Sequence, residues 1–333
     1  MDIRGFAQGE SHILALSTEG RVLSTGFNEF GQLGNGTRKS GQGFENIEIT
    51  GIKMISAGSG HSLALNTKGE VFWWGRGDSL DVENGGPNCI LKPEKFLLET
   101  EIVQIAAGRQ HGLMVGINGD IFTFGSNLFG QLGHQRGSQL KVEDLVDIKQ
   151  VCGGRNYSLA LNRNGEVFWW GQAIDTQGVP RRTLESDVLQ PKRIPGLSNI
   201  KTIACGGQYN LALNGEGQVY GWGLNFFGQM GQEGKNSKGK LFELNWNVGA
   251  DVPKQLAILD KVKNITATSM SSYYLLEGGG LYGLGYLKEG RERITEEDER
   301  AKKILFSQVS DKTLGYFQIE ELLREGITKE MHL

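Results

Sequence analysis

Cysteine is scarce in this chain, which has three among 333 residues. This odd, unpatterned count does not indicate the disulfide framework that holds small secreted domains together. No apolar run is long enough to cross a membrane, and the residues after Met1 do not form a charged-then-apolar leader. We therefore expect an intracellular protein without membrane insertion. The cytoplasm is the expected compartment, with a cytoskeletal or ciliary assembly or the nucleus as alternatives.

An excess of positive charge is also missing. The chain has 35 lysines and arginines against 38 aspartates and glutamates, a net charge of −3. A protein that binds nucleic acid through its phosphates needs a basic face. We expect no nucleic-acid partner.

Patterns of catalytic or metal-binding residues are absent too. The five histidines have no cysteine or histidine partner at zinc-like spacing, and no segment matches a phosphate-binding loop or a nucleophile elbow. Three of the histidines share one slot of an internal repeat, which later copies fill with tyrosine: His12, His61, His111, then Tyr157 and Tyr209. A slot shared by several repeats indicates a structural position. The sequence predicts no enzyme, no cofactor, and no catalytic, cofactor-binding or metal-ligating residue.

The chain does contain glycine in quantity, 50 residues, and the repeat explains most of it. The phrase Gly60-His61-Ser62-Leu63-Ala64-Leu65 has six recognisable copies, the last one worn, at residues 271–276. The copies lie about fifty residues apart, a period typical of propellers, solenoids or arrays.

Each copy continues as a strand, a short polar link with a glycine, and a return strand rich in β-branched and aromatic residues. The link glycines are Gly20, Gly69, Gly119, Gly165, Gly217 and Gly280, and the return strands end at Gly26, Gly75, Gly125, Gly171, Gly223 and Gly285. Short strands with periodic glycine and aromatic marks predict an all-β propeller.

A second phrase follows the first, third and fifth copies: Asn28-Glu29-Phe30-Gly31-Gln32-Leu33-Gly34, and its equivalents from Asn127 and Asn225. We interpret it as a compact turn whose amide side chains satisfy the loop backbone. Joined to the glycine–histidine–leucine strand, this N-x-F-G-Q-L-G phrase closely resembles the repeats of the regulator of chromosome condensation (RCC) family. The resemblance implies a ring of four-stranded blades, usually seven.

Six units are clear, and the last 48 residues or so are about one blade long. We expect an RCC-type propeller over residues 1–310 with seven blades, the last degenerate or composite. Residues 311–333 then form either that closing blade or a C-terminal helical tail.

Three places could bind a partner. The longest insertion contains Phe242, Leu244 and Trp246, which alternate with polar residues; they form either an outer blade strand or a projecting hairpin with aromatic anchors. Arg76 and Asp78 stand where the second unit lacks the turn phrase. Arg181 and Arg182, with Lys192 and Arg193, bracket a loop that is either solvated or holds an acidic partner.

We expect a non-catalytic scaffold that presents loops to protein partners, within a large complex. The alternative is a guanine nucleotide exchange factor for a Ran-like small GTPase, which the family resemblance implies. A third, less favoured reading is a substrate-recognition subunit of a ubiquitin ligase.

Overall fold

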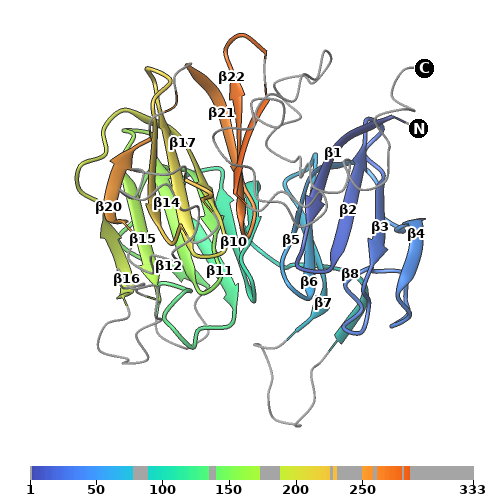
Figure 1. Cartoon of the computed structure of the whole chain (residues 1–333). Helices are drawn as coiled ribbons and strands as arrows, with labels where there is room; N and C mark the ends of the chain where they lie inside the picture. Colours follow the sequence, from blue (N-terminus) through green and yellow to red (C-terminus); the bar gives the residue numbers. More distant parts are fainter. Residues whose placement is uncertain are drawn as a thin grey trace. The chain divides into compact units, whose positions relative to one another are not determined.

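The computed structural model describes residues 2–77, 89–134, 140–172, 188–225, 228–230, 250–256, 258, 261–279 and 281–285. These residues form six antiparallel β-sheets and no helix (Figure 1). The chain divides into two compact units, and the first holds four of the sheets. We call the sheets blades and number them along the chain.

In each blade of the first unit, consecutive strands are neighbours. Blade 1 has β1 (Ile3–Gln8), β2 (His12–Ser17), β3 (Val22–Gly26) and β4 (Gly41–Asn46). Blade 2 has β5 (Ile52–Ala57), β6 (His61–Asn66), β7 (Val71–Arg76) and β8 (Cys89–Lys95). Blade 3 has β9 (Ile102–Ala107), β10 (His111–Gly116), β11 (Ile121–Gly125) and β12 (Lys141–Val142). Blade 4 has β13 (Ile148–Gly153), β14 (Tyr157–Asn162), β15 (Val167–Gly171) and β16 (Val188–Arg193).

The second unit contains one four-stranded meander and, within the described residues, one three-stranded meander. Blade 5 has β17 (Ile200–Cys205), β18 (Tyr209–Asn214), β19 (Val219–Gly223) and β20 (Ala250–Gln255). Blade 6 has β21 (Val262–Ala267), β22 (Ser271–Leu276) and β23 (Leu281–Gly285). The predicted seventh blade and the predicted boundary at residue 310 lie outside the described residues.

The backbone conformation at the repeated glycines explains why glycine occurs at these positions. The third strand of each blade has a glycine at its end, or one residue before its end in β7, with φ between +98° and +109°, a region that side chains disfavour. This glycine pairs with the first residue of the second strand, as His61 pairs with Gly75. The hairpin glycines have φ between +78° and +85°. In blade 6 the described hairpin glycine with positive φ is Gly279, one residue before the predicted Gly280, which is outside the described residues.

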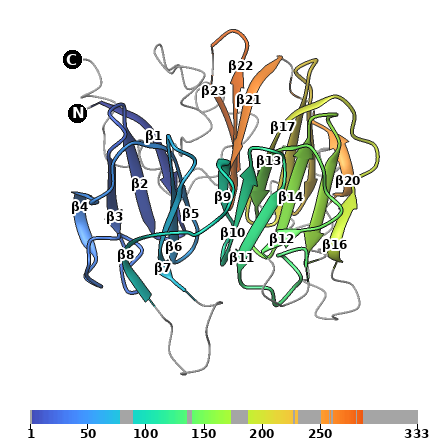
Figure 2. The ribbon, with the colours of Figure 1, turned by 180° about the vertical axis from the view of Figure 1, so that it is seen from behind.

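The apolar core lies between successive blades of a unit. The second strand of each blade is buried, apart from Leu276 at the end of β22, and within a unit it packs against the first strand of the next blade, as β2 does with β5 (Figure 2). One core cluster joins Leu14 and Leu16 of blade 1 to Ile52, Ile55 and Trp74 of blade 2. Each such side chain contributes roughly 1.5–3 kcal/mol when fully buried, so the seams between blades contain much of the stabilising energy of each unit.

The tandem tryptophans face opposite sides of their strands, as alternation requires. Trp74 and Trp170 are fully buried, whereas Trp73 and Trp169 are half-buried. They are packing residues of blades 2 and 4.

Candidate functional site

The turn phrase closes on itself through its amides. The Asn28 side-chain oxygen accepts a hydrogen bond from the Leu33 backbone N–H at 2.9 Å, and the Gln32 side-chain oxygen accepts one from Phe30 at 3.0 Å. Asn127 and Gln131 make the same bonds in blade 3, at 3.0 and 2.9 Å. The predicted role of the amides is therefore correct.

The closed turn of blade 1 also binds blade 2. The backbone carbonyl of Gln32 accepts hydrogen bonds from Ser62 Oγ and from Trp74 Nε1, each at 2.8 Å. The His12 Nε2 lies 2.8 Å from the same Ser62 Oγ. Because the one hydroxyl proton of Ser62 is donated to Gln32, its oxygen accepts from His12 Nε2–H. We call this group the polar staple.

Blades 3 and 4 repeat the staple. The Gln131 carbonyl accepts from Ser158 Oγ at 2.8 Å and Trp170 Nε1 at 2.9 Å, and His111 Nε2 lies 3.0 Å from Ser158 Oγ. In the second unit, Tyr274 Oη donates to the Gln229 carbonyl at 3.4 Å. The odd-numbered blades thus offer a turn carbonyl to the blade that follows.

The contact between blades 2 and 3, which we call the second seam, lacks the staple. Blade 2 has no turn phrase to offer, and blade 3 has Gly112 and Phe124 where blade 2 has Ser62 and Trp74. The ring of Phe124 fills the space beside Gly112, since a Cβ there would lie 2.3 Å from it. As a result the Nε2 of His61, a residue only 5% exposed, has no hydrogen-bond partner.

A pocket opens at this seam. Trp73, His61 and Phe124 line it together with Arg76, and the remaining lining is Ser59, Gly60, Gly77, Gln110, His111 and Gly125. The space between its walls is about 400 Å³ when open solvent is counted, but the cavity itself is only about 20 Å³, room for about one water molecule. The Trp73 and Phe124 rings meet edge to face with centroids 5.8 Å apart, and Phe96 packs behind them, 5.1 Å from Phe124. Three of the lining residues are glycines, namely Gly60, Gly77 and Gly125.

The cation of this pocket is Arg76, at the end of β7. Its guanidinium carbon lies 4.9 Å from the centroid of the Phe30 ring, within the range of a cation–π contact. Phe30 belongs to the turn phrase of blade 1, so two blades hold the arginine in place. Arg76 falls within the described part of the chain, as do Lys192 and Arg193 of the predicted basic loop.

The histidines of the seams are neutral near pH 7. Burial lowers the pKa of His61 to about 4, and the backbone of His111 opposes this shift. Burial, and then repulsion from His61, lowers the pKa of His12 and of His111 to about 3. The described lining contains no carboxylate, thiol or amine, so the pocket combines aromatic walls, two neutral imidazoles and one cation. Aromatic and arginine side chains are enriched where proteins contact one another.

The other predicted partner residues, Asp78, Arg181, Arg182, Phe242, Leu244 and Trp246, lie outside the described residues. Arg193 is described, and it pairs with Glu166 of its own blade at 2.9 Å. It therefore has a structural partner already.

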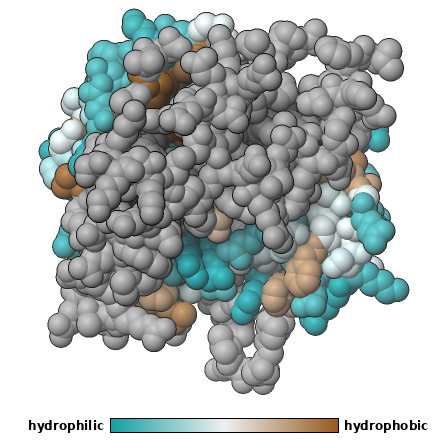
Figure 3. Space-filling model, viewed as in Figure 1, coloured by the Kyte–Doolittle hydropathy of each residue, from teal (hydrophilic) through white to brown (hydrophobic). Residues whose placement is uncertain are grey.

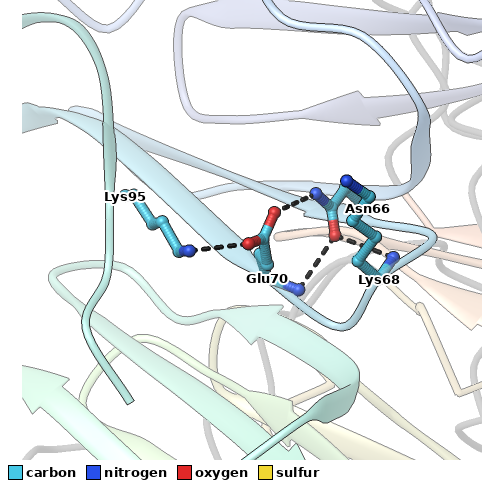
Figure 4. A network of polar contacts seen from close by, with 4 residues as sticks. All are labelled: Asn66, Lys68, Glu70 and Lys95. Carbon is cyan, nitrogen blue, oxygen red and sulfur yellow. Dashed lines mark hydrogen bonds and ion pairs between the residues drawn. The ribbon is translucent and has the colours of Figure 1, made fainter. Parts of the chain in front are cut away.

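Blade 2 has an ion pair like that of Arg193 with Glu166, between its fourth strand and its hairpin (Figure 4). Lys95 Nζ lies 2.6 Å from Glu70, whose other oxygen accepts from Asn66 at 2.7 Å, while Asn66 closes the hairpin by accepting from the backbone of Lys68 and Glu70. The hydrogen bond from Lys95 is the main cause of a lowered Glu70 pKa, followed by that from Asn66. These networks fix the fourth strand of a blade to its hairpin.

On the face drawn in Figure 3 the described surface is mostly hydrophilic, and apolar residues form separate patches. No helix in the described part of the chain is long and apolar enough to cross a membrane. Within those same residues, no three histidine, cysteine or acidic side chains gather as metal ligands would.

These blades, with their closed turns and polar staples, define a β-propeller. The chain belongs to the RCC1-like domain family, whose model it matches over residues 2–248. It is 31% identical over 239 residues to the ultraviolet-B receptor UVR8 of Arabidopsis thaliana, covering 69% of this chain and 43% of that protein. It is 32% identical to the probable E3 ubiquitin-protein ligase HERC6 of Homo sapiens, covering 69% and 19%.

Among solved structures, Prp20p of Saccharomyces cerevisiae superposes with a TM-score of 0.70 at 25% identity, over 85% of this chain and 71% of that one. The regulator of chromosome condensation of Mus musculus is 30% identical, covering 69% of this chain and 49% of its own. The chain spans less than half the length of these three curated relatives. The predicted all-β, RCC-type propeller is confirmed, with six blades described, and its relatives include a receptor, a regulator and ubiquitin ligases.

Reasoning from the sequence missed the second-seam pocket. A signal was present, because Gly112 occupies a position that holds serine or asparagine in blades 2, 4, 5 and 6, namely Ser62, Ser158, Asn210 and Ser272, and isoleucine (Ile13) in blade 1. Recognising that the gap leaves His61 without a partner requires knowing which strand packs on which.

Proposed function

We propose that this chain is a non-catalytic interaction module that binds protein partners inside the cell, within a larger assembly, and that the second-seam pocket is one of its docking points. The observation that carries the proposal is the pocket itself: aromatic walls and a held arginine at a seam where the staple is missing. Aromatic and arginine side chains in a small recess are typical of interface hot spots.

The test is affinity capture from native lysate with the wild type and two arginine variants. Arg76→Gln installs the residue that blade 4 has at the equivalent place, Gln172, and Arg163→Gln changes an exposed arginine of a hairpin as the matched control. We expect a stoichiometric set of partners that Arg76→Gln loses and Arg163→Gln retains, whether or not magnesium is chelated. If both variants capture the same partners equally, the pocket is not a docking point. If no protein is captured in stoichiometric amount, the scaffold function is wrong.

The second candidate is a guanine nucleotide exchange factor for a Ran-like small GTPase. The similarity to Prp20p favours it, since that protein is described by its binding to Gsp1p and histones. Exchange activity predicts a GTPase retained only after magnesium chelation empties its nucleotide site. It also predicts accelerated release of a fluorescent GDP analogue from Ran, which a scaffold would leave at its basal rate.

The third candidate, substrate recognition for a ubiquitin ligase, rests on the similarity to HERC6. It predicts ligase subunits among the captured proteins, together with a substrate whose ubiquitination falls when this chain is depleted.

A further inference from the structure

We propose that the second seam contains a binding site for one buried water molecule, which bonds to His61 Nε2 and takes the place that a serine hydroxyl has in the stapled seams. The water is then the polar link between blades 2 and 3. Three observations lead to this site: the volume of the cavity, the polar groups that line it, and the missing side chain at Gly112.

The volume of the cavity selects a ligand of the size of water. The cavity is about 20 Å³, and a water molecule needs roughly 10–15 Å³ on this scale. A cavity that takes up a benzene ring is about 150 Å³. No aromatic or branched side chain therefore fits, and what remains is a water molecule or a monatomic ion.

The lining provides the hydrogen bonds that a buried water requires, whereas a purely apolar cavity stays dry. His61 Nε2 and His111 Nδ1 are both buried without a hydrogen-bond partner, and both residues line the cavity. Ser59 and Gln110 are half-buried in the same lining and add a hydroxyl and an amide. A buried water makes about three hydrogen bonds, which this lining can supply.

Water is compatible with the protonation of both histidines. The proton of the Ser158 hydroxyl is donated to the Gln131 carbonyl, so His111 Nε2 donates to Ser158 and its Nδ1 is an acceptor. Water donates to that nitrogen. At His61 Nε2 it accepts if the nitrogen carries the proton and donates if it does not, so either tautomer of His61 is satisfied.

An ion fits this cavity less well than water. The described lining has no carboxylate to balance a cation, and the charge of Arg76 repels one. A chloride would lose its hydration. Its negative charge would also favour protonation of His61, whereas burial lowers the pKa of this residue to about 4.

The stapled seams show which group the water replaces. There the histidine Nε2 lies 2.8 or 3.0 Å from a serine Oγ, that of Ser62 or Ser158. Gly112 occupies the serine position in blade 3, and the Phe124 ring fills only part of the space beside it, since a Cβ on Gly112 would lie 2.3 Å from that ring. Water in the remaining space restores the missing hydroxyl.

The experiment counts long-lived waters in the full chain by oxygen-17 magnetic relaxation dispersion near neutral pH. We expect His61→Phe to contain one such water fewer than the wild type, because the phenyl ring offers no hydrogen bond. His12→Phe is the matched control, since His12 Nε2 bonds to Ser62 directly. It should contain as many long-lived waters as the wild type.

A second readout needs no substitution. In the wild type labelled at histidine, magnetisation should transfer from water to the His61 ring but not to the His12 ring. Should His61→Phe fail to fold, the double variant Gly112→Ser with Phe124→Trp installs the pair that blade 4 has, Ser158 and Trp170. Its new hydroxyl should displace the water and remove one from the count.

An unchanged count in His61→Phe, or no water transfer to the His61 ring of the wild type, would overturn the inference. Exchange of chloride for acetate at constant ionic strength tests the ion: a shift of the His61 ring nitrogens would identify bound chloride in place of water. None of these measurements involves a partner protein, so their failure is separate from a failure of affinity capture, which concerns the proposed function.

Discussion

At the end of the third strand of each blade, a glycine turns the chain at a φ that places any Cβ against the backbone of the second strand. Gly75 illustrates the constraint, since its φ is +98° and an added Cβ would lie 2.4 Å from the Gly60 carbonyl oxygen. The positions of the added Cβ and of the Gly60 carbonyl oxygen are both set by the backbone, so a rotamer change cannot relieve the clash.

The substitution Gly75→Ala is therefore expected to reduce the free energy of unfolding by roughly 1–3 kcal/mol. Gly43→Ala is the matched control, because Gly43 lies in β4 with no atom within 4 Å of its added Cβ. Its effect should stay within about 0.5 kcal/mol. Urea unfolding followed by tryptophan fluorescence measures both, and equal midpoints for the two variants would contradict the steric argument.

The strand-end glycines and His61 show what a sequence can and cannot predict. The recurrence of glycine at these strand ends was enough to place the turns, since few other reasons explain a glycine at one position of every repeat. The missing partner of His61 depends on Gly112, a residue of the next repeat, and on which strand faces which. A buried polar group without a partner leaves no mark on its own position in the sequence.

At the scale of the structural element, the turn phrase has two functions. Its amides close the loop, and its glutamine carbonyl receives the serine and tryptophan of the following blade. The first function could be predicted, because asparagine and glutamine at fixed offsets are typical of turns that bind their own backbone. The second could not, because the acceptor is a backbone oxygen that every residue possesses.

Ser158→Ala tests the second function. It removes one donor from the Gln131 carbonyl and the partner of the His111 ring, both buried, so we expect a loss of about 1–3 kcal/mol in unfolding free energy. Ser11→Ala, at an exposed position before β2, should change it by less than about 0.5 kcal/mol.

A double-mutant cycle of Ser158→Ala with His111→Phe isolates the pair. If the residues interact as the 3.0 Å distance indicates, the double variant should lose about 1 kcal/mol less unfolding free energy than the sum of the losses in the two single variants. Strict additivity would show that the two residues stabilise the seam independently.

At the scale of the whole molecule, the three buried histidines make stability depend on pH. Their pKa values are lowered to about 3, 4 and 3 for His12, His61 and His111, mainly by burial. Above pH 6.5 neither the folded nor the unfolded chain protonates them. Between pH 6.5 and 4 the unfolded chain binds protons that the folded chain excludes, so stability is lost as the pH falls.

We expect the free energy of unfolding to decrease by an amount on the order of several kcal/mol from pH 7 to pH 4, measured by urea denaturation across this range. His111→Tyr, which installs the residue that Tyr157 provides in blade 4, should reduce this dependence by about one third because tyrosine does not titrate there. An unchanged pH dependence in that variant would assign the acid sensitivity to other groups.

The fold as a whole was predictable from the period of the repeat, since six similar strand pairs can bury their apolar faces only against one another. The proposed partner surface was less predictable. Phe242 and Trp246 stood out because insertions and aromatic residues are visible in a sequence, whereas the second-seam pocket is defined by glycines and by a serine that is missing.

The alternation of stapled and unstapled blades also determines how such a chain can be lengthened or shortened. The turn phrase recurs at Asn28, Asn127 and Asn225, about every hundred residues, which is twice the period of the strands. Removing or duplicating one blade would make two blades of the same kind consecutive along the chain, either two with the turn phrase or two without it. Removing or duplicating two would leave each blade beside a neighbour of the kind it already has. The module that can be inherited or engineered intact is therefore a pair of blades.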